Sequence, residues 1–285
     1  MKLAILGASG QLGSELVTEA AALGYDVLPV THSAHDVEDG PEWLRQQGIE
    51  TIVNTAAFHD LSIAEAMPFA AWAVNVPVNL LCFCAERRLP YIYVSTDYVF
   101  DGAHAAYVAY VEDDPCRPLS VYGRSKLAGE LATRSFLPDT GSVCRISTLF
   151  GKAGCRAKGG GNLVDTIVNM VRDGREGTFD ADTWFSPTYA RDGARQILAA
   201  LQATLDGHAG IYHCANEGGC SHFTFAREVA RLIGSSWQPL ARYGNCSSIR
   251  PRCSWLTNTK LAQAPSWQEG LQAYLLEKGH MKEAN

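Results

Sequence analysis

Three glycines, Gly7, Gly10 and Gly13, follow directly on a short apolar run at the start of the chain. The run KLAIL (2–6) has the length and composition of a buried strand, and helical spacing begins at Leu12. A strand, a glycine turn and a helix in this order bring backbone N–H groups and the positive end of a helix dipole to one point. The feature is typical of a dinucleotide pyrophosphate site in a parallel α/β sheet. The spacing differs from G-x-G-x-x-G, so a plain glycine turn is the alternative.

The end of the second predicted strand, DVLPV (26–30), bears on which dinucleotide binds. An acidic side chain at this place holds the adenosine ribose in NAD enzymes, but here the chain continues Thr31-His32-Ser33. A 2′-phosphate would meet no repulsion there, and His32 can donate a hydrogen bond to it. We therefore predict NADPH as the cofactor, with NADH as the alternative, and expect Asp36 and Val37 beside the adenine.

Apolar strand-like runs alternate with helix-like stretches through the first half of the chain, the pattern of a doubly wound parallel α/β sheet. Further strands are predicted at TIVNTAA (51–57), YIYVS (91–95), SVCRIS (142–147) and GIYHCAN (210–216). Helices are predicted over 12–23, 73–88, 162–172, 190–205 and 223–233. The pattern predicts a Rossmann-type fold with a smaller, interleaved C-terminal lobe. We expect a dinucleotide-binding domain of residues 1–150 and 188–215, and a substrate-binding lobe of residues 151–187 and 216–285.

Composition argues against several kinds of partner. The net charge is −6, and acidic and basic residues are mixed without a basic block, which argues against nucleic-acid binding. No apolar run approaches the ~18–20 residues needed to span a bilayer, and the first strand is too short for a signal-peptide core. We therefore predict a cytoplasmic protein with no membrane partner. The nine cysteines include no C-x-x-C pair and the eight histidines are scattered, so no metal site is predicted.

The stretch YGRSKLAGE (122–130) places Tyr122 and Lys126 four residues apart, on one face of a helix. A tyrosine phenol has an ordinary pKa of ~10, and a nearby cation favours its ionised form, so the pair suits acid–base chemistry. Thr96 and Asp97 follow the strand at 91–95, at the edge where ligands of open α/β sheets bind. We predict Thr96, Tyr122 and Lys126 as the catalytic set. A solvated helix face and a turn cap are the alternatives.

These elements together resemble the extended short-chain dehydrogenase/reductase family and, within it, the dTDP-4-dehydrorhamnose reductases. The resemblance runs through nearly the whole chain, in GASGQLG, IVNTAAF, VSTDYVFDG, YGRSKLAGE, SPTYARD, GIYHCAN and FAREVA. It implies NAD(P)H-dependent reduction of the 4-keto group of a nucleotide-linked deoxysugar, from dTDP-4-dehydrorhamnose to dTDP-rhamnose. It further implies Gly10, Gln11 and Leu12 at the cofactor pyrophosphate, Ala56, Ala57 and Phe58 along the cofactor site, Thr96 and Asp97 at the sugar, and Arg250 at the nucleotide diphosphate.

The sequence departs from the family pattern at two places on the expected substrate side. Thr148 stands where family members usually carry Trp, and His59–Ser62 replace the usual Thr-Ala-Val-Asp. Two alternatives follow: a reductase or epimerase for a different nucleotide sugar, or a non-catalytic NADP-binding subunit resembling the methionine adenosyltransferase β subunit. We expect a nucleotide-sugar substrate, and a homodimer is left open.

Overall fold

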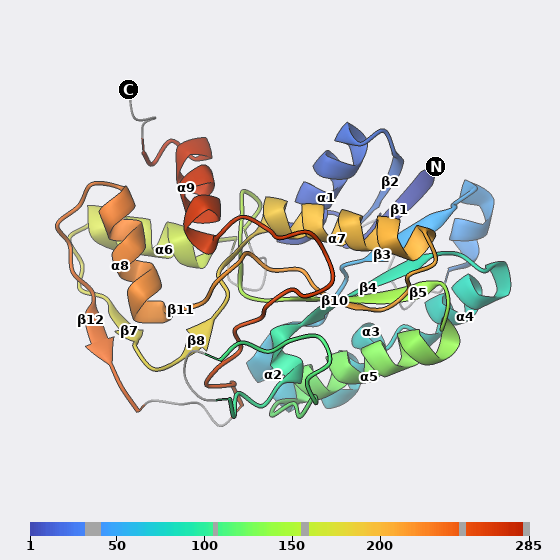
Figure 1. The fold of residues 1–285 in the computed structure, drawn as a ribbon, viewed down its shortest axis with the longest axis horizontal. Coiled ribbons are helices and arrows are strands. Elements are labelled where there is room, and N and C mark those ends of the chain that lie inside the picture. Colours follow the sequence, from blue (N-terminus) through green and yellow to red (C-terminus); the bar gives the residue numbers. More distant parts are fainter. Residues whose placement is uncertain (32–40, 105–107, 155–159, 245–248, 282–285) are drawn as a thin grey trace.

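A computed structural model describes residues 1–31, 41–104, 108–154, 160–244 and 249–281 of the chain. Its centre is a parallel sheet of six strands in the order β10-β5-β4-β3-β1-β2. The predicted fold class, a doubly wound Rossmann-type sheet with a smaller lobe, is confirmed (Figure 1). The strands are β1 (Lys2–Leu6), β2 (Asp26–Val30), β3 (Thr51–Asn54), β4 (Tyr91–Thr96), β5 (Gly141–Ile146) and β10 (Ile211–His213).

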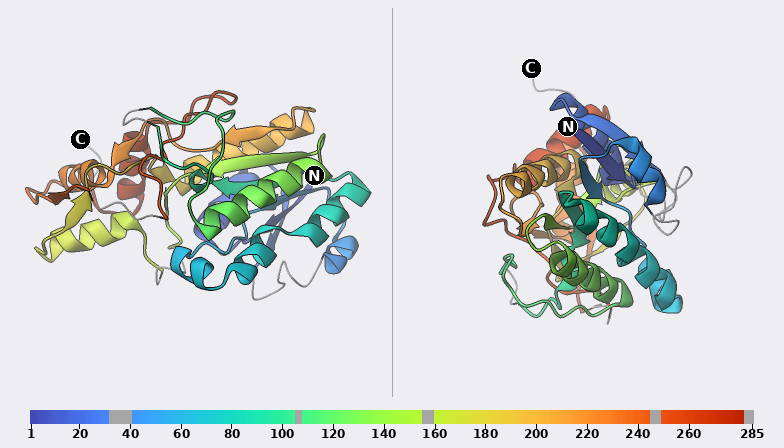
Figure 2. Two further views of the ribbon diagram at one scale, coloured as in Figure 1. Left: turned by 90° about the horizontal axis from the view of Figure 1, so that it is seen from below. Right: turned by 90° about the vertical axis from the view of Figure 1, so that its right-hand side faces the viewer.

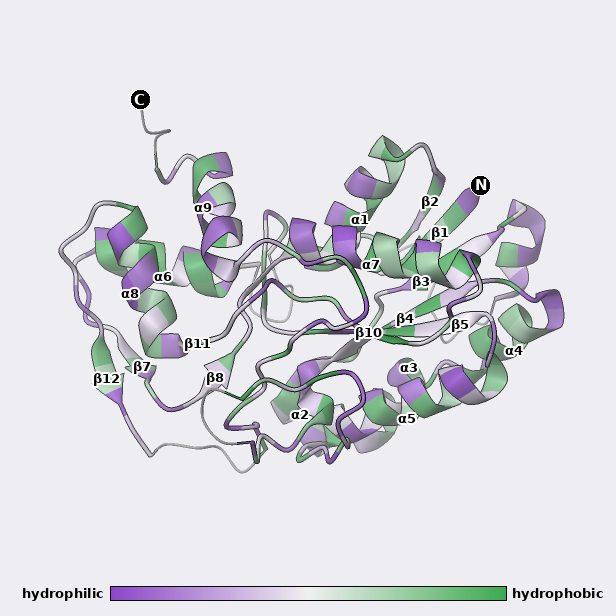
Figure 3. Ribbon diagram, in the orientation of Figure 1, coloured by the Kyte–Doolittle hydropathy of each residue, from purple (hydrophilic) through white to green (hydrophobic). Residues whose placement is uncertain are grey.

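Helices cover both faces of the sheet, because each strand is apolar on both sides. Leu3 and Ile5 of β1 pack in the core beneath α1 (Gln11–Ala22) and α7 (Ala190–Leu205). Ala4 and Leu6 join the opposite core, which includes Leu81 of α4 (Val78–Arg87). The other elements on that second side are η2 (Glu42–Gln47), α2 (Leu61–Ala66), α3 (Pro68–Asn75), η3 (Asp97–Val99) and α5 (Val121–Phe136). Figure 2 shows the two helical layers from other directions, and Figure 3 shows hydrophobic and hydrophilic residues alternating along α5 and α7.

The single helix predicted over 73–88 is wrong: the structure has α3 and α4, separated at Val76 and Pro77. Pro77 lacks an N–H to donate and pushes the preceding residue out of the helical region, and Val76 accordingly has φ −119° and ψ 76°. Among the described residues, the stretch 68–87 is long and apolar enough to cross a membrane, by length and composition alone. The sequence reading missed it. In the structure Leu80, Leu81 and Phe83 of this stretch are buried against the sheet.

The second lobe has a hydrophobic core of its own and lies beside the sheet (Figure 1). Phe150, Phe185, Phe225, Trp267 and Tyr274 are among the residues buried there. Its elements are β6 (Leu149–Phe150), α6 (Leu163–Arg172), β7 (Thr178–Asp180), β8 (Trp184–Phe185), β9 (Thr188–Tyr189), β11 (Cys220–Ser221), α8 (His222–Leu232), β12 (Leu240–Arg242) and α9 (Trp267–Glu277). The chain leaves the sheet after β5 and returns through α7 and β10, so the two parts interleave. The exact limits of the domains stay a prediction.

The strand order determines where a ligand can bind. From β1 the chain moves outward to β2, then crosses to β3 on the other side of β1. Where a parallel sheet changes direction in this way, a crevice opens at the carboxyl ends of the strands. The glycine loop follows β1 and Thr55 follows β3, so both lie at this crevice.

Candidate active site

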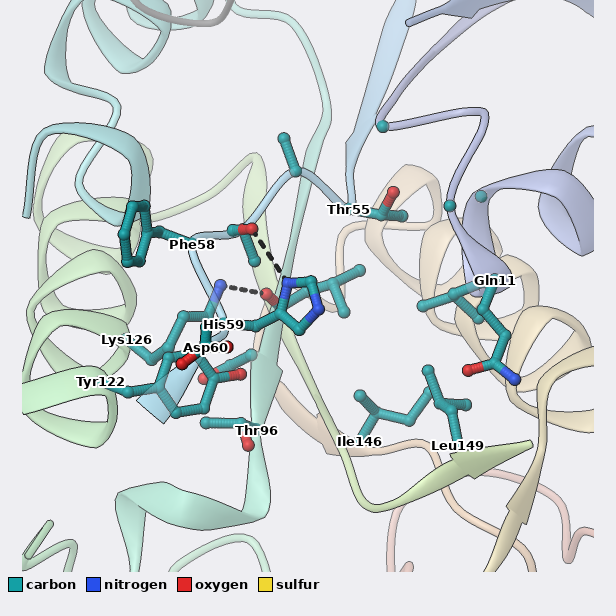
Figure 4. A pocket seen from close by; sticks show the side chains of 18 of the residues that line it. Gln11, Thr55, Phe58, His59, Asp60, Thr96, Tyr122, Lys126, Ile146 and Leu149 are labelled. Carbon is teal, nitrogen blue, oxygen red and sulfur yellow. Dashed lines mark hydrogen bonds between the residues drawn. The ribbon is translucent and has the colours of Figure 1, made fainter. Parts of the chain in front are cut away.

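A cavity of about 860 Å³ opens at the carboxyl ends of β1, β3, β4 and β5. It is lined by every predicted site residue that the structure describes. These are Gly7, Gly10, Gln11, Leu12, Gly13, Ala56, Ala57, Phe58, Thr96, Asp97, Tyr122, Lys126, Thr148 and Arg250. Figure 4 shows part of this lining, with Gln11, Phe58, Thr96, Tyr122 and Lys126 among the labelled residues. The remaining predicted residues, His32, Asp36 and Val37, lie outside the described residues.

The glycine loop forms one end of the cavity. Gly7 has φ +79°, and the N–H groups of Gly7 and Ala8 both donate to Val30 O at 3.0 Å. A Cβ on Gly13 would lie 2.2 Å from Gly7 O, so only glycine lets α1 pack this closely on the loop. No side chain caps the N-terminus of α1, which begins after Gly10. Exposed N–H groups at a helix N-terminus form a site for a phosphate group.

Gln11 gives a second indication that this end of the cavity takes a polar ligand. Its side chain is buried, and its Nε2 has no hydrogen-bond partner among the described residues. Unpaired buried donors are costly, and ligand groups commonly satisfy them. The residues present therefore fit the pyrophosphate of a dinucleotide.

The cofactor wall predicted at Ala56, Ala57 and Phe58 is held in place by two asparagines. Ala56 N donates to Asn54 Oδ1 at 3.0 Å. Asn75 of α3 clamps the Phe58 backbone, accepting from its N–H at 2.9 Å and donating to its carbonyl at 3.0 Å. This loop therefore presents a fixed surface to the cavity, although it has no regular secondary structure.

The start of α5 positions Tyr122 and Lys126. Ser120 Oγ accepts from Gly123 N at 3.0 Å, and Glu65 of α2 accepts from Val121 N at 2.7 Å, so two side chains cap the helix. One helical turn separates Tyr122 from Lys126, and both line the cavity. Tyr122 also hydrogen-bonds Thr96 at the end of β4, which brings the three predicted catalytic residues together.

The pKa values of the pair differ from the expectation drawn from their spacing. Burial raises the pKa of Tyr122 well above 10, against the opposing effect of its hydrogen bond with Thr96. Burial lowers the pKa of Lys126 to about 7, against the attraction of Glu130. We expected Lys126 to lower the pKa of the phenol, but burial dominates here. Tyr122 is therefore protonated at neutral pH, the form that can donate a proton.

Lys126 is 1% exposed, and its position is set by β4. Its Nζ donates to Val94 O at 2.7 Å and lies 4.0 Å from the centre of the Tyr93 ring. The first of these contacts is drawn as a dashed line in Figure 4. A carbonyl and a ring face both favour a cation, so the ammonium has partners on the strand that also carries Thr96.

Asp97 is buried among hydroxyl groups at the floor of the cavity. Thr96 donates to its Oδ1 at 3.1 Å and Ser147 to its Oδ2 at 2.9 Å, and Ser254 also hydrogen-bonds the carboxyl. Burial raises its pKa to about 6, although these hydrogen bonds favour the charged form. Ser147 is a residue that sequence reasoning missed. Ser147 could have been predicted from its place directly after β5, because Thr96 was predicted from its place at the end of a neighbouring strand.

Tyr98 is a second missed residue, and it connects Arg250 to the catalytic set. Arg250 Nη1 donates to Tyr98 Oη at 3.2 Å, and the Tyr98 ring meets the Tyr122 ring edge-on at 6.0 Å. The guanidinium is exposed at the cavity wall, where an anionic group can reach it. Tyr98 stands two residues after Thr96 in VSTDYVF, so the motif contained it.

The residues at the two places where the sequence departs from the family pattern also line the cavity. His59 lies in the open part of the cavity, with its Nδ1 3.3 Å from Ala57 O (Figure 4). Asp60 caps α2 by accepting from Ile63 N at 3.0 Å. Thr148 lines the cavity beside Leu149.

Other lining residues that sequence reasoning missed are Ser9, Thr31, Thr55, Ile146, Leu149 and Asn162. Within the described part of the chain, no group of three or more His, Cys, Asp or Glu side chains could hold a metal ion.

Comparison with known proteins identifies the family. The RmlD substrate binding domain family matches residues 1–279. A dTDP-4-dehydrorhamnose reductase of Mycobacterium tuberculosis is 36% identical over 88% of this chain and 81% of its own length. The chain belongs to the dTDP-4-dehydrorhamnose reductase family.

Two further proteins match the chain over nearly its whole length. The Bacillus anthracis dTDP-4-dehydrorhamnose reductase, solved in complex with NADP, covers 97% of this chain and 99% of its own, with 28% identity and a TM-score of 0.86. A Bacillus subtilis spore coat polysaccharide biosynthesis protein, SpsK, is 31% identical over 97% of this chain and 98% of its own. The family membership expected from the sequence motifs is therefore confirmed.

Proposed function

We propose that the chain reduces the 4-keto group of a dTDP-linked 4-keto-6-deoxyhexose with NADPH, converting dTDP-4-dehydrorhamnose to dTDP-rhamnose. The observation that carries the proposal is one cavity lined by both the glycine loop and the set Thr96, Tyr122 and Lys126. The reductase named in Mycobacterium tuberculosis and the NADP complex of the Bacillus anthracis reductase support it.

NADPH supplies the hydride when it is bound. The uncapped N-terminus of α1 and the loop from Gly7 to Gly13 would hold its pyrophosphate, and Ala56, Ala57 and Phe58 would line its ribose and nicotinamide. We infer NADPH rather than NADH because β2 ends at Val30 and Thr31 follows it, without a carboxylate to repel a 2′-phosphate. His32, Asp36 and Val37 remain the predicted contacts to the adenosine end.

Tyr122 gives its proton to the sugar oxygen as the keto group becomes an alkoxide. The raised pKa of the phenol keeps that proton available at neutral pH. Thr96 holds the phenol through its hydrogen bond and is itself oriented by Asp97. Lys126 supplies positive charge beside the tyrosinate that remains, since its ammonium lies one helical turn from Tyr122 and faces the same cavity.

Asp97, Thr148 and Arg250 are our assignments for contacts to the substrate. Arg250 suits the diphosphate because its guanidinium can donate two parallel hydrogen bonds, and Tyr98 already positions it. Residues 151–187 and 216–285 would form the lobe that closes over the nucleotide. A homodimer, a cytoplasmic location and the absence of nucleic-acid and membrane partners stay predictions.

A second candidate is reduction of a different nucleotide sugar. Thr148 and His59 favour it, since both line the cavity at positions where the family usually has other residues. Thr148 leaves more room than Trp would, so a bulkier sugar would fit there.

A substrate panel tests the proposal. NADPH oxidation is followed with dTDP-, UDP- and GDP-linked 4-keto-6-deoxyhexoses, each with NADH as a parallel cofactor. We expect turnover with the dTDP sugar and NADPH to exceed the other combinations at least tenfold. Equal turnover with a UDP or GDP sugar would support the second candidate, and no oxidation with any sugar would refute reductase activity.

A further inference from the structure

Glu130 is a buried carboxylate to which the proposed reaction gives no role. It ends the stretch YGRSKLAGE and lies one helical turn beyond Lys126 on α5, where it is 2% exposed. Arg145 of β5 donates three hydrogen bonds to it, from Nε to Oε1 at 3.1 Å, from Nε to Oε2 at 3.2 Å and from Nη2 to Oε2 at 2.8 Å. A carboxylate buried this deeply is costly unless it is fully paired, so its presence needs a reason beyond packing.

Glu130 reaches the same strand segment that the catalytic residues hold. Ser95 Oγ donates to Glu130 Oε1 at 2.5 Å. Ser95 lies between Val94, whose carbonyl accepts from Lys126 Nζ at 2.7 Å, and Thr96, which hydrogen-bonds Tyr122. Three consecutive residues of β4 are therefore each bound by one side chain of α5.

The negative charge of Glu130 also acts on the Lys126 ammonium, one helical turn away. Burial lowers the pKa of Lys126 to about 7, and this net value already includes the opposing, raising effect of Glu130. Other titratable and charged groups also surround Lys126. The ring centre of Tyr93 lies 4.0 Å from Nζ, while Tyr122, Asp97 and Asp60 line the same cavity and Arg145 of β5 is paired with Glu130.

We propose that Glu130 is a positioning residue that keeps Lys126 protonated and holds Ser95 in line with Thr96, and so sets the upper pH limit of the reaction. This inference rests on the proposed function for its catalytic consequence only. The charge state of Lys126 is a property of the protein without any substrate, so the two claims can fail separately. The arrangement also explains why Arg145 is needed, since it stabilises the buried Glu130 carboxylate.

The direct test is the titration of Lys126 by NMR, in protein with 13C-labelled lysine and no added ligand. The Lys126 signal is assigned from its loss in Lys126→Met, and the wild type is compared with Glu130→Gln. Removing the negative charge disfavours the ammonium, so we expect the Lys126 midpoint in Glu130→Gln to lie at least one pH unit lower than in the wild type, that is, at a proton concentration at least tenfold higher. An unchanged midpoint would overturn the proposal.

The kinetic test is the pH profile of kcat with NADPH and the keto-sugar. In Glu130→Gln the alkaline limb should move to lower pH, with kcat reduced at least tenfold at pH 8 and less than threefold at pH 6. A uniform loss at every pH would show a merely structural role and contradict the proposal. Ser95→Ala removes the hydrogen bond but no charge, so it should lower kcat without moving the limb.

A matched control is Glu112→Gln. Glu112 is equally buried, its carboxylate accepts from Thr259, and its backbone carbonyl accepts from Arg145 Nη1 at 3.1 Å, but its charge is not among the effects on Lys126. We expect it to leave the midpoint of Lys126 unchanged, and an equal shift would refute the special role of Glu130. If Glu130→Gln does not fold because Arg145 is left unpaired, the double variant Glu130→Gln/Arg145→Gln removes both charges. The lower Lys126 midpoint should persist in it, because the charge of Glu130, and not that of Arg145, acts on the Lys126 ammonium.

Discussion

Replacing Gly13 by alanine tests whether the glycine loop holds the cofactor. The added Cβ would lie 2.2 Å from Gly7 O and 2.8 Å from the Ala8 Cα, and real Cβ atoms essentially never approach closer than 3.0 Å. The loop and α1 must therefore separate by about 0.8 Å, the difference between 3.0 and 2.2 Å. Overpacking of this kind costs ~1–3 kcal/mol. At roughly 2–4 °C per kcal/mol, the melting temperature should fall by about 5 °C.

The same displacement moves the N–H groups of the α1 N-terminus away from the pyrophosphate. A hydrogen bond to a charged group contributes ~1.5–3 kcal/mol, so losing one weakens NADPH binding by roughly 10- to 100-fold. The assay is NADPH titration by calorimetry, beside thermal unfolding of the same samples. Gly210→Ala is the matched control, because its Cβ would meet only the Tyr212 ring at an ordinary 3.9 Å. A Gly13→Ala protein that binds NADPH within threefold of the wild type would refute the loop's assigned role.

Three further predictions follow from the site. Tyr122→Phe should lower kcat by at least ~100-fold, which is the contribution typical of general-acid catalysis. The Kd for NADPH, measured by calorimetry, should stay within threefold of the wild type. A nearly normal kcat would show that Tyr122 is not the proton donor. Asp97 has a folded pKa of about 6, above the unfolded value of 3.8, so its stability contribution falls as pH rises from 4 to 6 and stays low above that. In urea unfolding, the stability of Asp97→Asn relative to the wild type should therefore rise by about 2.4 kcal/mol between pH 4 and pH 7. A difference that does not change with pH would contradict the burial argument. Arg250→Ala should raise the KM for the nucleotide sugar roughly tenfold and leave kcat nearly unchanged, because one hydrogen bond to a charged group is lost. Arg252, which pairs with Asp182, is the control, and Arg252→Ala should leave KM unchanged. Equal effects of the two substitutions would argue against a specific contact from Arg250.

The elements that local sequence determines were predicted closely. β1, the glycine loop and α1 form from one contiguous stretch, and α7 was predicted with its observed bounds, 190–205. The α3–α4 break was missed because the apolar spacing continues through it, and the restriction imposed by Pro77 was not weighed against that spacing.

The site residues also fall into those that local sequence predicts and those that depend on contacts between distant parts of the chain. Thr96, Tyr122 and Lys126 come from motifs at the ends of local elements, and the structure brings them to one cavity. Ser147 and Tyr98 line the same cavity, but their contacts depend on strand pairing and on the position of Arg250, which lies far away in the chain. No short-range pattern encodes such pairings.

The ion pair of Glu130 with Arg145 was not predictable for a further reason. The two residues are fifteen apart, on α5 and β5, and meet only because the helix packs across the sheet. Sequence reading treats a charged residue on a helix as solvated, whereas both side chains are buried here.

The most direct test of the account follows the hydride itself. The wild-type protein is incubated with NADPH carrying deuterium at the transferred position and with dTDP-4-dehydrorhamnose, and the sugar product is analysed by NMR. The account predicts one deuterium atom, located at C4 of the product. A product without deuterium at C4, as an epimerase would give, or unconsumed NADPH, as a purely cofactor-binding subunit would leave, would contradict it.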